Sequence, residues 1–145
     1  MDYLTQLFKL EGKVAAITGS GGFLCSEMAR ALSKAGVKIA VLDRDEKNIN
    51  AIADEIQSVG GTAIPYVLDV TDKNNWNNVL TKVLDDFGDV DILINGAGIN
   101  APTPFFDITI EEWHAILDVH HVGTLFGCQV YEKHMVHTNK GSIIN

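Results

Sequence analysis

VAAITGSGGFLC, residues 14–25, decides the fold, because in this stretch an apolar run leads directly into a glycine-rich turn. Residues without a Cβ can take positive φ and let backbone N–H groups approach a pyrophosphate. The helix that follows would present its positive dipole end to that anion. Leu24 stands where the pattern G-x-G-x-x-G has its third glycine, so a phosphate site needs support from the rest of the chain.

Three further apolar runs also end in acidic or glycine-rich tips. The run at residues 37–42 ends at Asp43, which follows the glycine turn at about the 20-residue spacing typical of an acid that binds an adenosine ribose. The run at 63–68 ends in Asp69-Val70, and the run at 90–94 ends in Asn95-Gly96-Ala97-Gly98. In an open parallel sheet these ends lie along one edge, where ligands bind.

Strand and helix patterns alternate along the chain without a linker. Strands are predicted at 13–18, 37–42, 63–68, 90–94 and from Gly141, and helices at 22–35, 45–58, 72–87, 109–118 and 119–138. Residues 1–12 form a lead-in, Gly36 and Gly60 end the first two helices, and Thr109 begins the fourth with capping-box spacing. The alternation predicts an α/β, Rossmann-type, doubly wound parallel sheet of strand order 3-2-1-4-5, with the chain stopping at the fifth strand.

Composition limits the possible functions. With 145 residues the chain predicts one dinucleotide-binding domain, 1–145, and is short for an enzyme that also needs a substrate site. A formal net charge of −8 argues against a nucleic-acid partner, and no apolar run reaches the roughly 18 residues of a membrane span.

The start of the sequence lacks the features of a secretory signal, which favours the cytoplasm. The two cysteines and five histidines match no disulfide framework or metal motif, so no metal is expected and most histidines are expected on solvated helix faces.

The motifs together resemble the short-chain dehydrogenase/reductase family from about residue 11 to residue 145. They are Thr18-Gly19 with its glycine turn, Asp69-Val70, Asn95-Gly96-Ala97-Gly98 and the closing Gly-Ser-Ile-Ile-Asn. The resemblance implies a homo-oligomeric, nicotinamide-dependent oxidoreductase, a dimer or tetramer, that moves hydride between the cofactor and an alcohol or carbonyl. The glycine turn and the lead-in at residues 7–13 favour a subgroup that acts on sugar acids or polyols.

The resemblance also implies roles for single residues. The pyrophosphate would lie against Gly19, Ser20, Gly21, Gly22, Phe23 and Leu24; the adenosine ribose against Asp43; the adenine against Asp69 and Val70; and the nicotinamide side against Asn95, Ala97 and Gly98. Asp43 would repel a 2′-phosphate, which favours NAD over NADP, although Arg44 beside it could turn toward a phosphate. Each residue also has a structural alternative: a simple turn, a helix cap, or, for Asn95, a brace between strands.

Three departures from the family pattern are visible. Phe23 and Cys25 replace the second and third glycines, which predicts a slightly shifted helix and a retained site. His120 stands at the position of the family's catalytic asparagine, which puts the proton relay in question. The family's serine and Tyr-x-x-x-Lys motif would lie beyond Asn145, so residues 1–145 correspond to the cofactor-binding half and are expected to be inactive alone.

Two other functions fit parts of the sequence. A nucleotide-binding protein without catalysis, such as a redox sensor, would explain the histidine at the asparagine position and the end of the chain before the family's catalytic motif. A methyltransferase would share a glycine loop after the first strand and an acid after the second, but Asn95-Gly96-Ala97-Gly98 counts against it.

Overall fold

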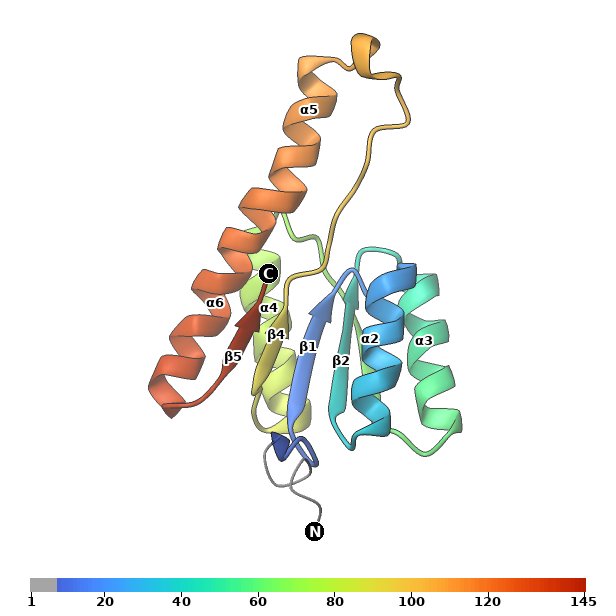
Figure 1. Cartoon of the computed structure of the whole chain (residues 1–145). Helices are drawn as coiled ribbons and strands as arrows, with labels where there is room; N and C mark the ends of the chain where they lie inside the picture. The colour runs from blue at the N-terminus through green and yellow to red at the C-terminus, as the bar shows by residue number, and fades with distance from the viewer. Residues whose placement is uncertain (1–7) are drawn as a thin grey trace.

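Five parallel strands form one sheet in the order β3-β2-β1-β4-β5, which confirms the predicted topology (Figure 1). The strands are β1 (Val14–Thr18), β2 (Lys38–Asp43), β3 (Ala63–Val67), β4 (Ile92–Ile94) and β5 (Ser142–Ile144). The computed structural model describes residues 8–145, so most of the expected lead-in lies outside the described residues. All five residues of β1 are buried, as a strand covered on both faces requires.

Helices cover both faces of the sheet. Figure 1 shows α2 (Phe23–Lys34) and α3 (Glu46–Ser58) on one face, and α4 (Lys73–Phe87) and α6 (Gly123–Thr138) on the other. Successive residues of β1 point to opposite faces, so Ala15 packs with the α2–α3 side and Ala16 with the α4–α6 side. No helix in residues 8–145 is both long and apolar enough to cross a bilayer.

The helices begin where the sequence places cap residues. Asp45 accepts a hydrogen bond from the Asn48 N–H at the start of α3, and Asp72 caps α4 in the same way. The predicted capping box at Thr109 is present and begins α5 (Ile110–Leu117). Gly36 has φ +83°, a left-handed conformation suited to the end of α2.

Residues 110–138 form one long rod that extends beyond the carboxyl edge of the sheet (Figure 1). The two predicted helices meet in a π-helical turn, η2 (Asp118–Val122), which joins α5 to α6. The short 3-10 turn η1 (Phe105–Asp107) lies at the far end of this rod. A π turn holds one residue more than an α turn, so it changes which residues of the rod face the sheet.

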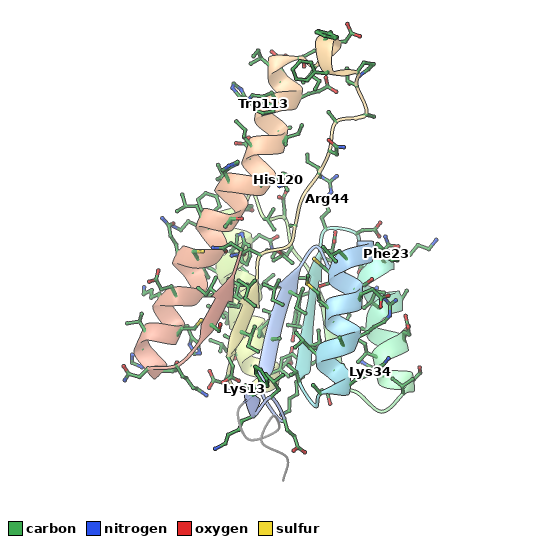
Figure 2. The ribbon with its side chains drawn as sticks, in the orientation of Figure 1. Lys13, Phe23, Lys34, Arg44, Trp113 and His120 are labelled. Carbon is green, nitrogen blue, oxygen red and sulfur yellow. The ribbon has the colours of Figure 1, made fainter. Side chains whose placement is uncertain are left out.

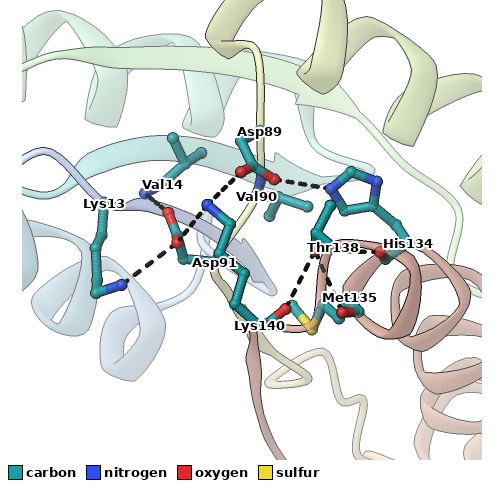
Figure 3. A network of polar contacts seen from close by, with 9 residues as sticks. All are labelled: Lys13, Val14, Asp89, Val90, Asp91, His134, Met135, Thr138 and Lys140. Atoms are coloured by element: carbon teal, nitrogen blue, oxygen red, sulfur yellow. Dashed lines mark hydrogen bonds and ion pairs between the residues drawn. The ribbon is translucent and has the colours of Figure 1, made fainter.

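Charged residues at the amino edge of the sheet hold the last strand in place. Figure 2 shows Lys13 at this edge, away from Phe23, Arg44 and His120 near the carboxyl end. Asp91 accepts a hydrogen bond from the Val14 N–H at 3.0 Å, and its other oxygen lies 3.4 Å from both Lys13 Nζ and Lys140 Nζ (Figure 3). These contacts connect β1, β4 and the segment before β5.

Asp89 extends this network to α6. Its carboxylate contacts Lys140 Nζ and lies 2.8 Å from His134 Nε2 (Figure 3). The side chain of His134 is 18% exposed, so this histidine is an exception to the expectation that most histidines lie on solvated helix faces. Because a carboxylate next to the helix accepts a hydrogen bond, the ring is drawn against the loop instead of into solvent.

Asp89→Asn should make the protein less sensitive to acid. The hydrogen bonds from Lys140 and His134 lower the pKa of Asp89 to about 2, so its carboxylate stabilises the fold above the ordinary aspartate pKa of about 4. This stabilisation, no more than about 1 kcal/mol after solvent screening, is lost progressively as pH falls from about 4 to about 2. Urea unfolding at pH 6 and pH 3 measures it, with the exposed Asp85→Asn as control. Equal pH dependence in wild type and Asp89→Asn would contradict the assignment.

Candidate functional site

A cavity of about 540 Å³ lies at the carboxyl edge of the sheet. Its walls come from the turn between β1 and α2, the ends of β2 and β3, the loop after β4, and the inner side of the rod. The lining residues are Gly19, Gly22, Phe23, Leu24, Cys25, Asp43, Arg44, Leu68, Asp69, Val70, Thr71, Gly96, Ala97, Gly98, Ile99, Ala115, Asp118 and Val119. The strand ends singled out in the sequence therefore meet around one space.

The β1–α2 turn brings the first turn of a helix to this cavity. Gly19 has φ +73°, and a Cβ there would lie 2.7 Å from the carbonyl oxygen of Gly96. Gly22, the residue before α2, has no side-chain cap, and the exposed residues Phe23 and Leu24 follow it. The first backbone N–H groups of α2 thus lack a side-chain partner at a positive helix end, which suits an anion.

Ser20 and Gly21 lie behind the cavity wall. The Ser20 side chain is fully buried, its hydroxyl donates to the carbonyl of Ile17, and its N–H donates to the carbonyl of Leu42. Gly21 donates its N–H to Asp43 Oδ2 at 3.1 Å. Both residues shape the turn and neither lines the cavity, because this tight turn directs them toward the sheet.

Two acidic residues border the cavity in different settings. Asp43 ends β2, and its second oxygen accepts the N–H of Asp45 at 3.2 Å, so the carboxylate is held in place beside the glycine turn. Asp69 Oδ1 accepts the hydroxyl and the N–H of Thr71, and these bonds, helped by the charge of Arg44, lower the pKa of Asp69. Both carboxylates are therefore held in place, and backbone N–H groups use part of their capacity to accept hydrogen bonds. Arg44 extends over the same edge (Figure 2).

The loop after β4 is fastened to β1. Thr18 Oγ1 accepts the N–H groups of Gly96 and Ala97 at 3.0 and 3.1 Å. Asn95 does not line the cavity: its Nδ2 donates to Asn145 Oδ1 at 2.8 Å, so it braces β4 against β5. This contact corresponds to the alternative role stated for Asn95 above, a brace between strands.

His120 contacts this loop from the π turn. Its Nε2 lies 2.9 Å from the carbonyl oxygen of Ile99 and 3.2 Å from the Ile99 nitrogen. Gly98 leaves room for the ring, since a Cβ at Gly98 would lie 2.6 Å from His120 Cε1. The hydroxyl of Thr124 donates to the His120 carbonyl at 2.7 Å. His120 is exposed and does not line the cavity, but these contacts hold its ring against the loop that does.

Several wall residues could not be found from sequence motifs. Ala115, Asp118 and Val119 reach the cavity only because the rod extends past the carboxyl edge of the sheet (Figure 1). Thr18 was recognised as part of a motif, but its role as the acceptor for the loop after β4 depends on a contact 78 positions away. Within residues 8–145, no group of His, Cys, Asp and Glu is arranged to hold a metal ion.

The chain is similar to known oxidoreductases in both sequence and fold. The sequence profile of the short chain dehydrogenase family matches residues 13–145. An uncharacterized oxidoreductase, UxuB of Bacillus subtilis, is 35% identical over 151 residues, which cover 94% of this chain and 54% of that protein.

Three solved structures share the fold. A candidate D-mannonate oxidoreductase from Haemophilus influenza with bound NAD has a TM-score of 0.82 at 34% identity and covers 87% of this chain and 51% of that one. An NAD⁺-bound xylitol dehydrogenase has a TM-score of 0.88 at 29% identity, covering 93% and 52%. A metagenomic short-chain oxidoreductase in complex with NADP has a TM-score of 0.85 at 27% identity, covering 93% and 62%.

The chain spans about half the length of the first relatives it matches. The shared half contains all five strands and the cavity at their carboxyl ends. Because the family match runs through this entire region, and the relatives agree with it in both sequence and fold, the chain belongs to the short-chain dehydrogenase family.

Proposed function

We propose that residues 1–145 are the cofactor-binding half of an NAD-dependent dehydrogenase that transfers hydride between nicotinamide and an alcohol or carbonyl. The observation that carries this proposal is the uncapped start of α2 opening onto the same cavity as Asp43. A helix N-terminus matches a pyrophosphate, and a fixed carboxylate at the end of the second strand matches ribose hydroxyls. When bound, the cofactor supplies the hydride acceptor or donor.

The residues present fit a dinucleotide along the cavity. Backbone N–H groups of Phe23 and Leu24 would hold the pyrophosphate, with Gly19 and Gly22 providing close approach. The Asp43 carboxylate keeps lone pairs free for ribose hydroxyls, since each oxygen accepts one backbone N–H. Ser20 and Gly21 would act indirectly, by shaping the turn.

The remaining walls would hold the two ends of the cofactor. Asp69 and Val70 would border the adenine, and Ala97 and Gly98 the nicotinamide side. Asn95 would support this loop through its contact with Asn145. The charge of Arg44 helps to lower the pKa of Asp69 and would offset part of the acidic charge at the adenosine end.

The substrate is proposed to be a sugar acid or polyol. This rests on the similarity to the candidate D-mannonate oxidoreductase and to the xylitol dehydrogenase.

The compartment is proposed to be the cytoplasm, because two free cysteines suit a reducing environment. Aromatic side chains are exposed at the far end of the rod, which supports assembly into a homo-oligomer. They are Phe105, Phe106 and Trp113, with exposed fractions of 80%, 95% and 50%.

Turnover by the full-length protein tests the proposed activity. Purified protein with NAD and a panel of sugar acids and polyols should form NADH, measured by its absorbance. Residues 1–145 alone should form none. If the full-length protein binds NADH and oxidises no alcohol, the second candidate holds, a nucleotide-binding protein without catalysis, which the histidine at the asparagine position favours.

His120→Asn should preserve or raise turnover of the full-length protein. An asparagine amide can donate to the Ile99 carbonyl and accept from the Ile99 N–H together, whereas the single Nε2 can make only one of these bonds at a time. The rate of NADH formation measures the effect. The exposed neighbour provides a control, His121→Asn, which should leave the rate unchanged. A large loss of turnover in His120→Asn alone would contradict this expectation.

A further inference from the structure

The first turn of α2 meets the loop after β4 at Cys25 and Gly96. Cys25 is 5% exposed, and its Sγ lies 3.6 Å from the carbonyl oxygen of Gly96. Burial, together with the charge of Asp43, raises the pKa of this thiol. The S–H can therefore donate to the carbonyl, and the contact joins α2 to the loop after β4, which both line the cavity.

Gly96 is a glycine because of space, not because of backbone conformation. It is absent from the residues with positive φ, so other residues could adopt its backbone geometry. A Cβ at this position would overlap the Cys25 sulfur and lie 3.0 Å from the carbonyl oxygen of Thr18. The same Cβ would lie 3.8 Å from the Cys25 Cβ, an ordinary van der Waals distance. The main obstacle is thus the sulfur atom itself.

We propose that Cys25 and Gly96 form a complementary pair, in which the thiol fills the space left by the missing Cβ and sets how closely α2 approaches the loop after β4. Cys25, which stands where the family has a glycine, is then a positioning residue. The close approach is retained because the small residue lies on the opposite side of the contact. Its effect on the cofactor rests on the proposed function, since both residues of the pair line the cavity.

A double-mutant cycle in the full-length protein tests the pair. Gly96→Ala should lower Tm by roughly 5–10 °C and weaken NADH binding about tenfold. Cys25→Ala should have a smaller effect on both. Cys25→Ala/Gly96→Ala should recover more than half of each loss, because the two Cβ atoms would then be in normal contact. Recovery stays incomplete, since the Thr18 oxygen remains close.

The other cysteine supplies a matched control. Cys128 Sγ lies 3.7 Å from Asn95 and Asn145 side-chain atoms, so Cys128→Ala/Gly96→Ala should recover nothing. Additive losses in the Cys25 double variant, or equal recovery with Cys128→Ala, would overturn the pairing. If the wild type does not bind NADH, the proposed function fails, and the unfolding measurements still decide whether the pair exists.

Discussion

Gly19→Ala is expected to weaken cofactor binding severely and to cost about 2–4 kcal/mol of folding free energy. Its φ of +73° costs an alanine about 1–2 kcal/mol. The new Cβ would also lie 2.7 Å from the Gly96 carbonyl oxygen, which forces the β1–α2 turn and the loop after β4 apart. Chemical denaturation measures the stability loss, and NADH fluorescence measures the binding loss, expected to be about 100-fold or more.

Gly60→Ala separates the two causes. Gly60 has a similar φ of +88°, but a Cβ there would have nothing within 4 Å. This variant should lose only about 1 kcal/mol and bind NADH normally. Equal losses of stability and NADH binding in both variants would show that the contact between the new Cβ and the Gly96 carbonyl has no effect.

Trp76→Ala is expected to cost about 3–5 kcal/mol, a large part of the stability of a domain this size. The Trp76 side chain is fully buried on α4, and its ring meets Tyr131 edge-on with centroids 5.8 Å apart. Its indole N–H donates to the Val70 carbonyl at 2.9 Å, so the same residue holds one wall of the cavity. Urea unfolding and NADH affinity should therefore both decline.

Trp113 provides the comparison for this prediction. It is 50% exposed on α5, far from the sheet, and Trp113→Ala should change stability by less than about 0.5 kcal/mol. Trp76→Phe should lose about 1 kcal/mol, because it keeps most of the packing and removes the hydrogen bond. A Trp76→Ala variant as stable as Trp113→Ala would contradict the core described for the α4–α6 side.

The sequence was sufficient for the sheet and for the position of the cavity. β1 and β2 are continuous apolar runs bounded by glycine or acidic residues. Buried parallel strands have this pattern. Their order follows from right-handed crossovers, so residues at the strand ends had to meet. Cap residues such as Asp45 and Thr109 fixed the helix starts because their hydrogen bonds are local.

Side-chain direction within the motifs could not be predicted. Spacing places Ser20 and Asn95 at a ligand edge, but the turn directs the Ser20 hydroxyl back to the carbonyl of Ile17, and a contact 50 positions away turns Asn95 toward Asn145. The π turn adds a residue to a regular helical pattern, and no local signal marks it. His120 could be assigned to a family position from sequence, yet its contact with Ile99 depends on that turn.

Cofactor preference tests the central claim most directly, because it depends on Asp43 lying beside the adenosine ribose. Fluorescence titration of the protein with NADH and NADPH should give NADH binding at least about tenfold tighter, since the Asp43 carboxylate would repel a 2′-phosphate. Asp43→Ser should remove most of this preference, and Asp54→Ser, an exposed acid on α3, should retain it. Equal affinity of the wild type for the two cofactors, or no binding of either, would contradict the account.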